Sequence, residues 1–64
     1  MKFNIGDTVI VYDRYRFAIP LTAIIEEKST TNDGVRLKLL ESNTTNYPIG
    51  CSNVWVSEKQ IRKV

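Results

Sequence analysis

The stretch that decides the fold is Val35-Arg36-Leu37-Lys38-Leu39-Leu40. Apolar and charged residues alternate along it with the period of two that a half-buried β-strand requires. Val35, Leu37 and Leu39 should therefore point into a core. Arg36 and Lys38 should point the opposite way, toward solvent. This alternation predicts a strand over residues 35–40.

A turn signal and a second apolar run precede this strand. Asp33-Gly34 is a favoured pair for a tight hairpin turn, because both residues tolerate a positive φ. The run before it is Leu21-Thr22-Ala23-Ile24-Ile25-Glu26-Glu27-Lys28. Its adjacent isoleucines and the turn signals around it favour a strand over a short helix. We expect the two runs to pair as an antiparallel hairpin.

The rest of the chain divides into short strands and loops. Gly6-Asp7 is a turn pair that introduces a β-branched and aromatic strand over residues 8–12. The expected segments after it are a loop over residues 13–20, a loop over residues 41–50, a strand over 54–56, one 3₁₀ turn over 57–60 and a strand over 61–64. This order predicts an all-β protein: a five-stranded SH3-like barrel with one 3₁₀ turn before the last strand, in which residues 1–64 form one domain.

Composition limits the chemistry. Nine Lys or Arg against seven Asp or Glu give a net charge of +2, which is too small to attract nucleic acid unless the cations cluster. With no histidine and one cysteine, Cys51, the chain has no donor set for structural zinc and no internal disulfide. We expect no metal or cofactor.

No apolar run approaches a membrane span or a signal peptide, so we expect a cytoplasmic protein without membrane contact.

The first third of the chain resembles a known family. Phe3-Asn4-Ile5-Gly6-Asp7-Thr8-Val9-Ile10-Val11 resembles the opening of KOW-type small barrels, which occur in ribosome-associated and transcription-associated proteins. The resemblance covers residues 3–28, because the run that starts at Leu21 falls where that family places its second strand. It implies a small barrel.

Catalytic equipment is sparse in this sequence. Without histidine, Cys51 has no evident base, so we interpret it as a plain or half-buried thiol. Glu26 and Glu27 are neighbours on a predicted strand and should point to opposite faces, which prevents them from forming a catalytic pair. We therefore predict that the protein is not an enzyme.

One candidate binding surface is the loop after the first strand. Its proposed contact residues are Arg14, Tyr15, Arg16, Phe17 and, from the later loop, Tyr47, and Tyr12 is expected to lie beside them. Aromatic and arginine side chains are enriched at protein interfaces and their hot spots. In a barrel this small, Phe17 and one tyrosine could instead cap the open end of the core. Arg14 and Arg16 are then the better candidates for contact with a partner protein.

The alternative surface is a basic and aromatic face. If the valines beside Trp55 fill the core, Trp55 faces outward, as Arg36 and Lys38 do on the neighbouring strand. An indole ring can stack on a base while cations neutralise phosphates, so these three residues are the candidate nucleic-acid site. The competing interpretation is that Trp55 packs under a loop and the cations are solvated.

We therefore expect a non-enzymatic binding module. The first hypothesis is a small protein-binding adaptor or inhibitor, since the composition is typical of phage or mobile-element accessory proteins that act on a host factor. The alternative is a small barrel that binds nucleic acid. The chain is expected to be a monomer or a small homo-oligomer, because a short last strand leaves an edge that a second copy could pair with.

Overall fold

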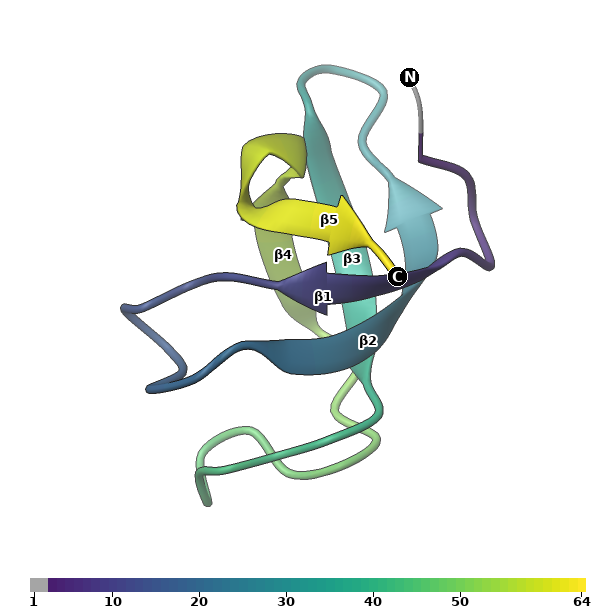
Figure 1. Cartoon of the computed structure of the whole chain (residues 1–64). Coiled ribbons are helices and arrows are strands. Elements are labelled where there is room, and N and C mark those ends of the chain that lie inside the picture. Colours follow the sequence, from purple (N-terminus) through teal and green to yellow (C-terminus); the bar gives the residue numbers. More distant parts are fainter. Residues whose placement is uncertain (1–2) are drawn as a thin grey trace.

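The computed structural model describes residues 3–64, so Met1 and Lys2 of the expected domain lie outside the described residues. The protein is all-β, with a five-stranded antiparallel sheet in the order β4-β3-β2-β1-β5 (Figure 1). The elements are β1 (Thr8–Val11), β2 (Leu21–Lys28), β3 (Gly34–Leu39), β4 (Val54–Ser57), the 3₁₀ turn η1 (Glu58–Gln60) and β5 (Ile61–Lys63). Each predicted strand is confirmed, with ends that differ by about one residue.

The centre of the sheet is the β2–β3 hairpin. Ala23 pairs with Leu39 and Ile25 with Leu37, and all four side chains are buried. The alternation that predicted β3 is therefore the pattern of inward and outward side chains in the structure.

The turn of this hairpin differs from the prediction. Gly34 is the first residue of β3, and the only residues of positive φ within residues 3–64 are Gly6 and Gly50. The chain reverses over residues 29–33, where Asn32 Oδ1 accepts a hydrogen bond from the Gly34 N–H at 2.7 Å. The expected tight turn of positive φ at Asp33-Gly34 is wrong, because an asparagine side chain closes a longer loop in its place.

A register shift on β2 corrects a second expectation. The ladder with β3 is irregular between Ile25 and Glu27, so β2 carries a bulge there. The bulge removes the strict alternation, and the carboxylates of both Glu26 and Glu27 contact Arg36. The expectation that these two side chains point to opposite faces is wrong at this position.

The core is formed by the inward residues of all five strands and one loop residue. Its buried members are Val9, Val11, Phe17, Leu21, Ala23, Ile25, Val35, Leu37, Leu39, Val54, Val56 and Ile61. Phe3, Tyr47 and Cys51 are partly buried against this cluster. Phe17 thus brings the β1–β2 loop, residues 12–20, into the packing of the sheet.

The predicted 3₁₀ turn is confirmed. Ser57 is its N-cap, with Oγ accepting from the Lys59 N–H at 3.1 Å, and Gln60 Oε1 accepts from the Ser57 N–H at 3.0 Å. This reciprocal pair is a capping box, which satisfies the free amides at the start of a helical turn. Within residues 3–64 no helix is long and apolar enough to cross a membrane.

Candidate binding surfaces

The β1–β2 loop is held by one buried carboxylate. Asp13 is only 4% exposed, and its carbonyl oxygen accepts from the N–H groups of Arg16 (3.2 Å) and Phe17 (2.8 Å). Its Oδ1 accepts from the Tyr15 N–H at 3.1 Å, and its Oδ2 forms an ion pair with Arg16 Nη1. These contacts fold residues 13–17 into a single fixed turn.

Two aromatic rings anchor the same loop to the rest of the molecule. Phe17 is 2% exposed, and its ring meets Tyr47 edge to face, with centroids 5.3 Å apart and an interplanar angle of 73°. Tyr47 lies in the long loop of residues 40–53, where its carbonyl oxygen accepts from Ser42 Oγ at 2.6 Å. In Figure 1 the β1–β2 loop projects to the left of the sheet and the long loop lies below it, so both lie toward the lower left of the view. Phe17 and Tyr47 therefore pack at this end of the core.

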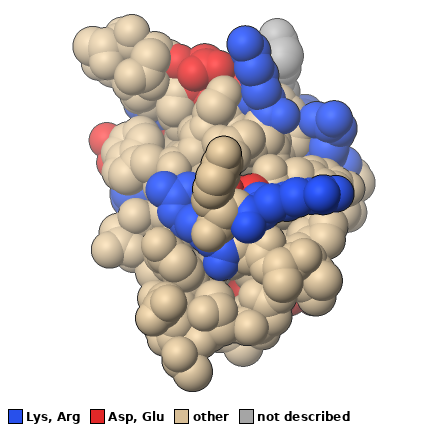
Figure 2. Space-filling model, turned by 90° about the vertical axis from the view of Figure 1, so that its left-hand side faces the viewer, with Lys and Arg blue, Asp and Glu red and all other residues tan. Residues whose placement is uncertain are grey.

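Other side chains of the β1–β2 loop point outward. Tyr15 is fully exposed, at 101% of its reference area, and Arg14 and Ile19 are exposed beside it. At the base of the loop, Arg62 of β5 lies over the exposed ring of Tyr12, with Cζ 5.7 Å from the ring centroid. Figure 2 views the side on which this loop projects and shows Lys and Arg side chains across the middle of the face.

Two members of this surface, Ile19 and Arg62, were given no role in the sequence analysis, whereas Tyr12 was expected to lie on it. The alternation of Val9 and Val11 into the core already implied that Tyr12 faces outward. Nothing in the sequence indicated that Arg62 lies over it, because that contact depends on the pairing of β1 with β5.

The second predicted surface lies on the outer face of β3 and β4. Arg36 is directly opposite Trp55 in the ladder, and Lys38, opposite Ile24, is exposed. Trp55 is 42% exposed, as expected from the burial of the valines on either side of it. The three side chains therefore share one face of the sheet.

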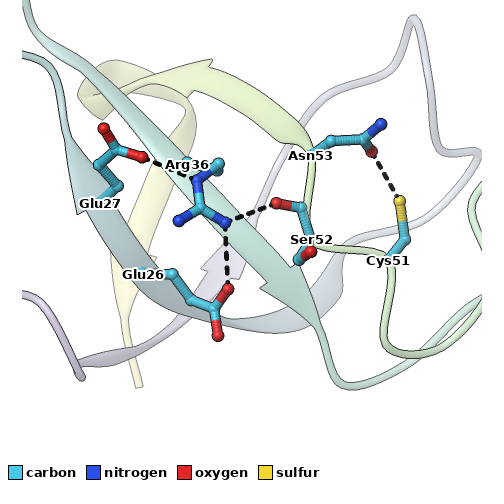
Figure 3. A network of polar contacts seen from close by, with 6 residues as sticks. All are labelled: Glu26, Glu27, Arg36, Cys51, Ser52 and Asn53. Carbon is cyan, nitrogen blue, oxygen red and sulfur yellow. Dashed lines mark hydrogen bonds and ion pairs between the residues drawn. The ribbon is translucent and has the colours of Figure 1, made fainter.

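The guanidinium of Arg36 is already paired within the protein. Its Nε donates to Glu27 Oε1 at 3.0 Å and its Nη1 to Glu26 Oε1 at 3.2 Å and to the Ser52 carbonyl oxygen at 2.8 Å (Figure 3). Two carboxylates thus surround one guanidinium. In the adjoining segment Cys51 Sγ donates to Asn53 Oδ1 at 3.0 Å, and the thiol is partly buried.

One carboxylate outside both surfaces has a shifted pKa. Glu41 Oε1 accepts from the Thr22 N–H at 2.8 Å, and this backbone hydrogen bond lowers the pKa of Glu41 because it stabilises the charged form. The bond ties the start of the long loop to β2.

Residues 3–64 contain no group of three or more His, Cys, Asp or Glu side chains placed to hold a metal ion. Comparison with protein-family models, with curated proteins and with solved structures finds no match for the chain.

Proposed function

We propose that the chain is a non-enzymatic protein-binding module, an adaptor or inhibitor, whose contact surface is the β1–β2 loop. The observation that carries the proposal is a fully exposed tyrosine, Tyr15, at the tip of a loop whose backbone is fixed by buried Asp13. Tyr12 and Ile19 of the same loop are exposed as well, and large apolar side chains exposed together favour a role in contact.

The physical basis is preorganisation. Binding by a mobile loop must offset the entropy lost when the loop becomes ordered, whereas this loop is ordered by its own hydrogen bonds. Arg14 and Ile19 extend the surface around Tyr15, and tyrosine and arginine are the residues most enriched in interface hot spots. The arrangement suits insertion of a projecting loop into a recess of a partner.

Nucleic-acid binding at the second surface ranks below this. Phosphate recognition there requires free cations beside Trp55, but Arg36 is paired with two carboxylates that would repel a phosphate. Lys38 then remains as the exposed cation of that predicted site.

We further propose that the five strands form an SH3-like barrel. The order β4-β3-β2-β1-β5 and the 3₁₀ turn between the last two strands support this arrangement. A small module with one projecting contact loop suits an accessory protein, of a phage or mobile element, that acts on a host factor.

The test is affinity capture with matched variants. The immobilised chain, incubated with lysate of its host, should retain a discrete protein, whose affinity is then measured by calorimetry. Tyr15→Ala should weaken that affinity about 30-fold or more, as truncation of a hot-spot tyrosine does. Lys38→Ala, an equally exposed change on the other surface, should leave it within about twofold. A partner whose affinity is unchanged by Tyr15→Ala would contradict the proposal.

A further inference from the structure

A hollow of about 600 Å³ lies between the β2–β3 loop, β4 and η1. Its lining includes Asn32, Asp33, Gly34, Trp55, Ser57 and Gln60. None of these residues belongs to the β1–β2 loop, so the hollow is a candidate site independent of the proposed contact surface.

The hollow is open because Gly34 has no side chain. A Cβ at this position would lie 2.8 Å from Asn32 Oδ1 and 3.7 Å from Trp55 Cε3. A larger residue would therefore collide with the Asn32 side chain and contact the indole ring at Cε3. Glycine at the first position of β3 leaves the indole accessible from this side.

The only charged side chain in the lining is Asp33. Its position is fixed, because Asp33 Oδ2 accepts from Ser57 Oγ at 2.7 Å and its carbonyl oxygen accepts from the Glu58 N–H at 3.0 Å. Asp33 Oδ1 has no hydrogen-bond partner among residues 3–64. A held carboxylate with a free oxygen thus lies in the same hollow as an exposed indole.

The cations near Trp55 do not cancel the negative charge of Asp33. Arg36, opposite Trp55 in the ladder, is held by Glu26 and Glu27 on β2. Among residues 3–64, no Lys or Arg lines the hollow. The local charge facing a ligand is therefore negative, the opposite of what a phosphate requires.

We propose that this hollow binds a cationic side chain, lysine or arginine, from a basic segment of a partner protein. The cation lies over the Trp55 ring, where the ring quadrupole attracts it, and pairs with the free oxygen of Asp33. An ammonium or guanidinium group gains from both contacts, whereas a neutral side chain of the same shape gains only from packing.

Trp55 is itself the reporter for the test, because it is the only tryptophan in the chain. The probe is a blocked peptide with one arginine between glycines, titrated at low salt while Trp55 fluorescence is recorded. A peptide with citrulline in place of arginine keeps the shape and removes the charge. Single-stranded oligothymidylate, a polyanion, tests whether the hollow binds a negatively charged ligand instead.

We expect the arginine peptide to give a saturable change with a Kd on the order of 1 mM, as suits a single exposed contact. Asp33→Asn should weaken this binding roughly three- to fivefold, the scale of an exposed ion pair. Glu41→Gln removes the same charge outside the hollow and should leave the affinity within about twofold. The citrulline peptide and the oligonucleotide should not bind in this range.

Equal binding of the citrulline peptide, or an unchanged affinity in Asp33→Asn, would overturn the proposal. Preferential binding of the oligonucleotide would do the same and would favour the nucleic-acid alternative. Because Asp33 also holds Ser57, the folding of Asp33→Asn is checked by its urea midpoint and by the NMR shift of a core methyl group. If this variant is unfolded, Trp55→Phe read by NMR replaces it and should retain weakened, charge-dependent binding.

Discussion

At the residue scale, three glutamates on the surface of this protein have defined hydrogen-bond or ion-pair partners. Glu41 accepts from the backbone of β2, and Glu26 and Glu27 share one guanidinium. Surface ion pairs between long side chains are usually weak, because their flexibility and solvation oppose pairing. The Glu41 contact differs because its donor is a fixed backbone N–H group.

The lowered pKa of Glu41 makes its contribution to stability depend on pH. A carboxyl whose pKa is lower in the folded state stabilises the fold above its unfolded pKa, and this stabilisation is lost as pH falls through the folded value. The stability difference between the native chain and Glu41→Gln should therefore shrink as pH falls from 7 to below about 4. Urea unfolding across this range measures the difference, and NMR titration of the carboxyl carbon measures the pKa. A Glu41 pKa at or above that of a free glutamate would contradict the expectation.

The outward orientation of side chains was predictable, but their partners were not. Alternation placed Arg36, Lys38 and Trp55 on one face, which the structure confirms. It gave no sign that Arg36 is paired with two glutamates, because the bulge that brings Glu26 and Glu27 to the same guanidinium has no simple signal in the sequence. The sequence therefore predicted which side chains lie on that face but overestimated its free positive charge.

At the scale of elements, the β1–β2 loop is a folded turn. Its strength comes from Asp13, the only polar side chain that is buried among residues 3–64. A buried carboxylate is costly unless its oxygens have partners, and here they are a backbone N–H and a guanidinium from within the same five residues. The loop conformation and the burial of this charge therefore depend on each other.

Asp13→Ala should lower the free energy of unfolding by about 1–3 kcal/mol, because the Tyr15 N–H and Arg16 lose a buried acceptor. Chemical denaturation measures this change. Arg14→Ala is the matched control in the same loop: its side chain is exposed, and the expected change is below about 0.5 kcal/mol. Equal effects of the two substitutions would show that Asp13 does not hold the loop.

The sequence predicted the hairpin of β2 and β3 but not the means by which it turns. Asp33-Gly34 is a strong local signal for positive φ, yet Asn32 caps the Gly34 amide and Asp33 contacts Ser57 across the sheet. One local and one tertiary contact thus outweigh the dipeptide preference. The contact of Asp33 with Ser57 joins residues 24 positions apart, so a local pattern could not reveal it.

At the scale of the molecule, stability rests on one small core at the centre of the sheet. A chain of 64 residues buries little apolar surface, so each core side chain carries a large share of the stability. Leu37 lies at the middle of β3, is fully buried and pairs with both β2 and β4.

Leu37→Ala should therefore destabilise the protein by about 2–5 kcal/mol, through lost burial and the cavity left behind. Leu40→Ala, the same change at a partly exposed position just beyond β3, should cost less than about 1.5 kcal/mol. Thermal unfolding followed by circular dichroism compares the two. Similar losses at both positions would contradict the assignment of β3 as the central core strand.

The strand composition of the fold was predictable because each strand has its own local pattern, and the five predicted strands and the 3₁₀ turn are present. The packing of the long loop was not predictable, since it depends on the contact between Tyr47 and Phe17, which lie 30 positions apart in the chain. Of the first candidate surface, the sequence indicated the exposed Arg14 and Tyr15. It left open whether Phe17 is a contact residue or caps the core, and the structure buries Phe17 in the core.

This separation within the β1–β2 loop has a consequence for variation and engineering. Asp13 and Phe17 face inward and set the loop conformation, while Arg14, Tyr15 and Ile19 face solvent. Under the proposed function, the inward set determines folding and the outward set determines what is recognised, so the two can change independently. A library randomised at positions 14, 15, 18 and 19, with 13, 16 and 17 kept, should yield folded proteins of new specificity, and natural sequences can diversify by the same route.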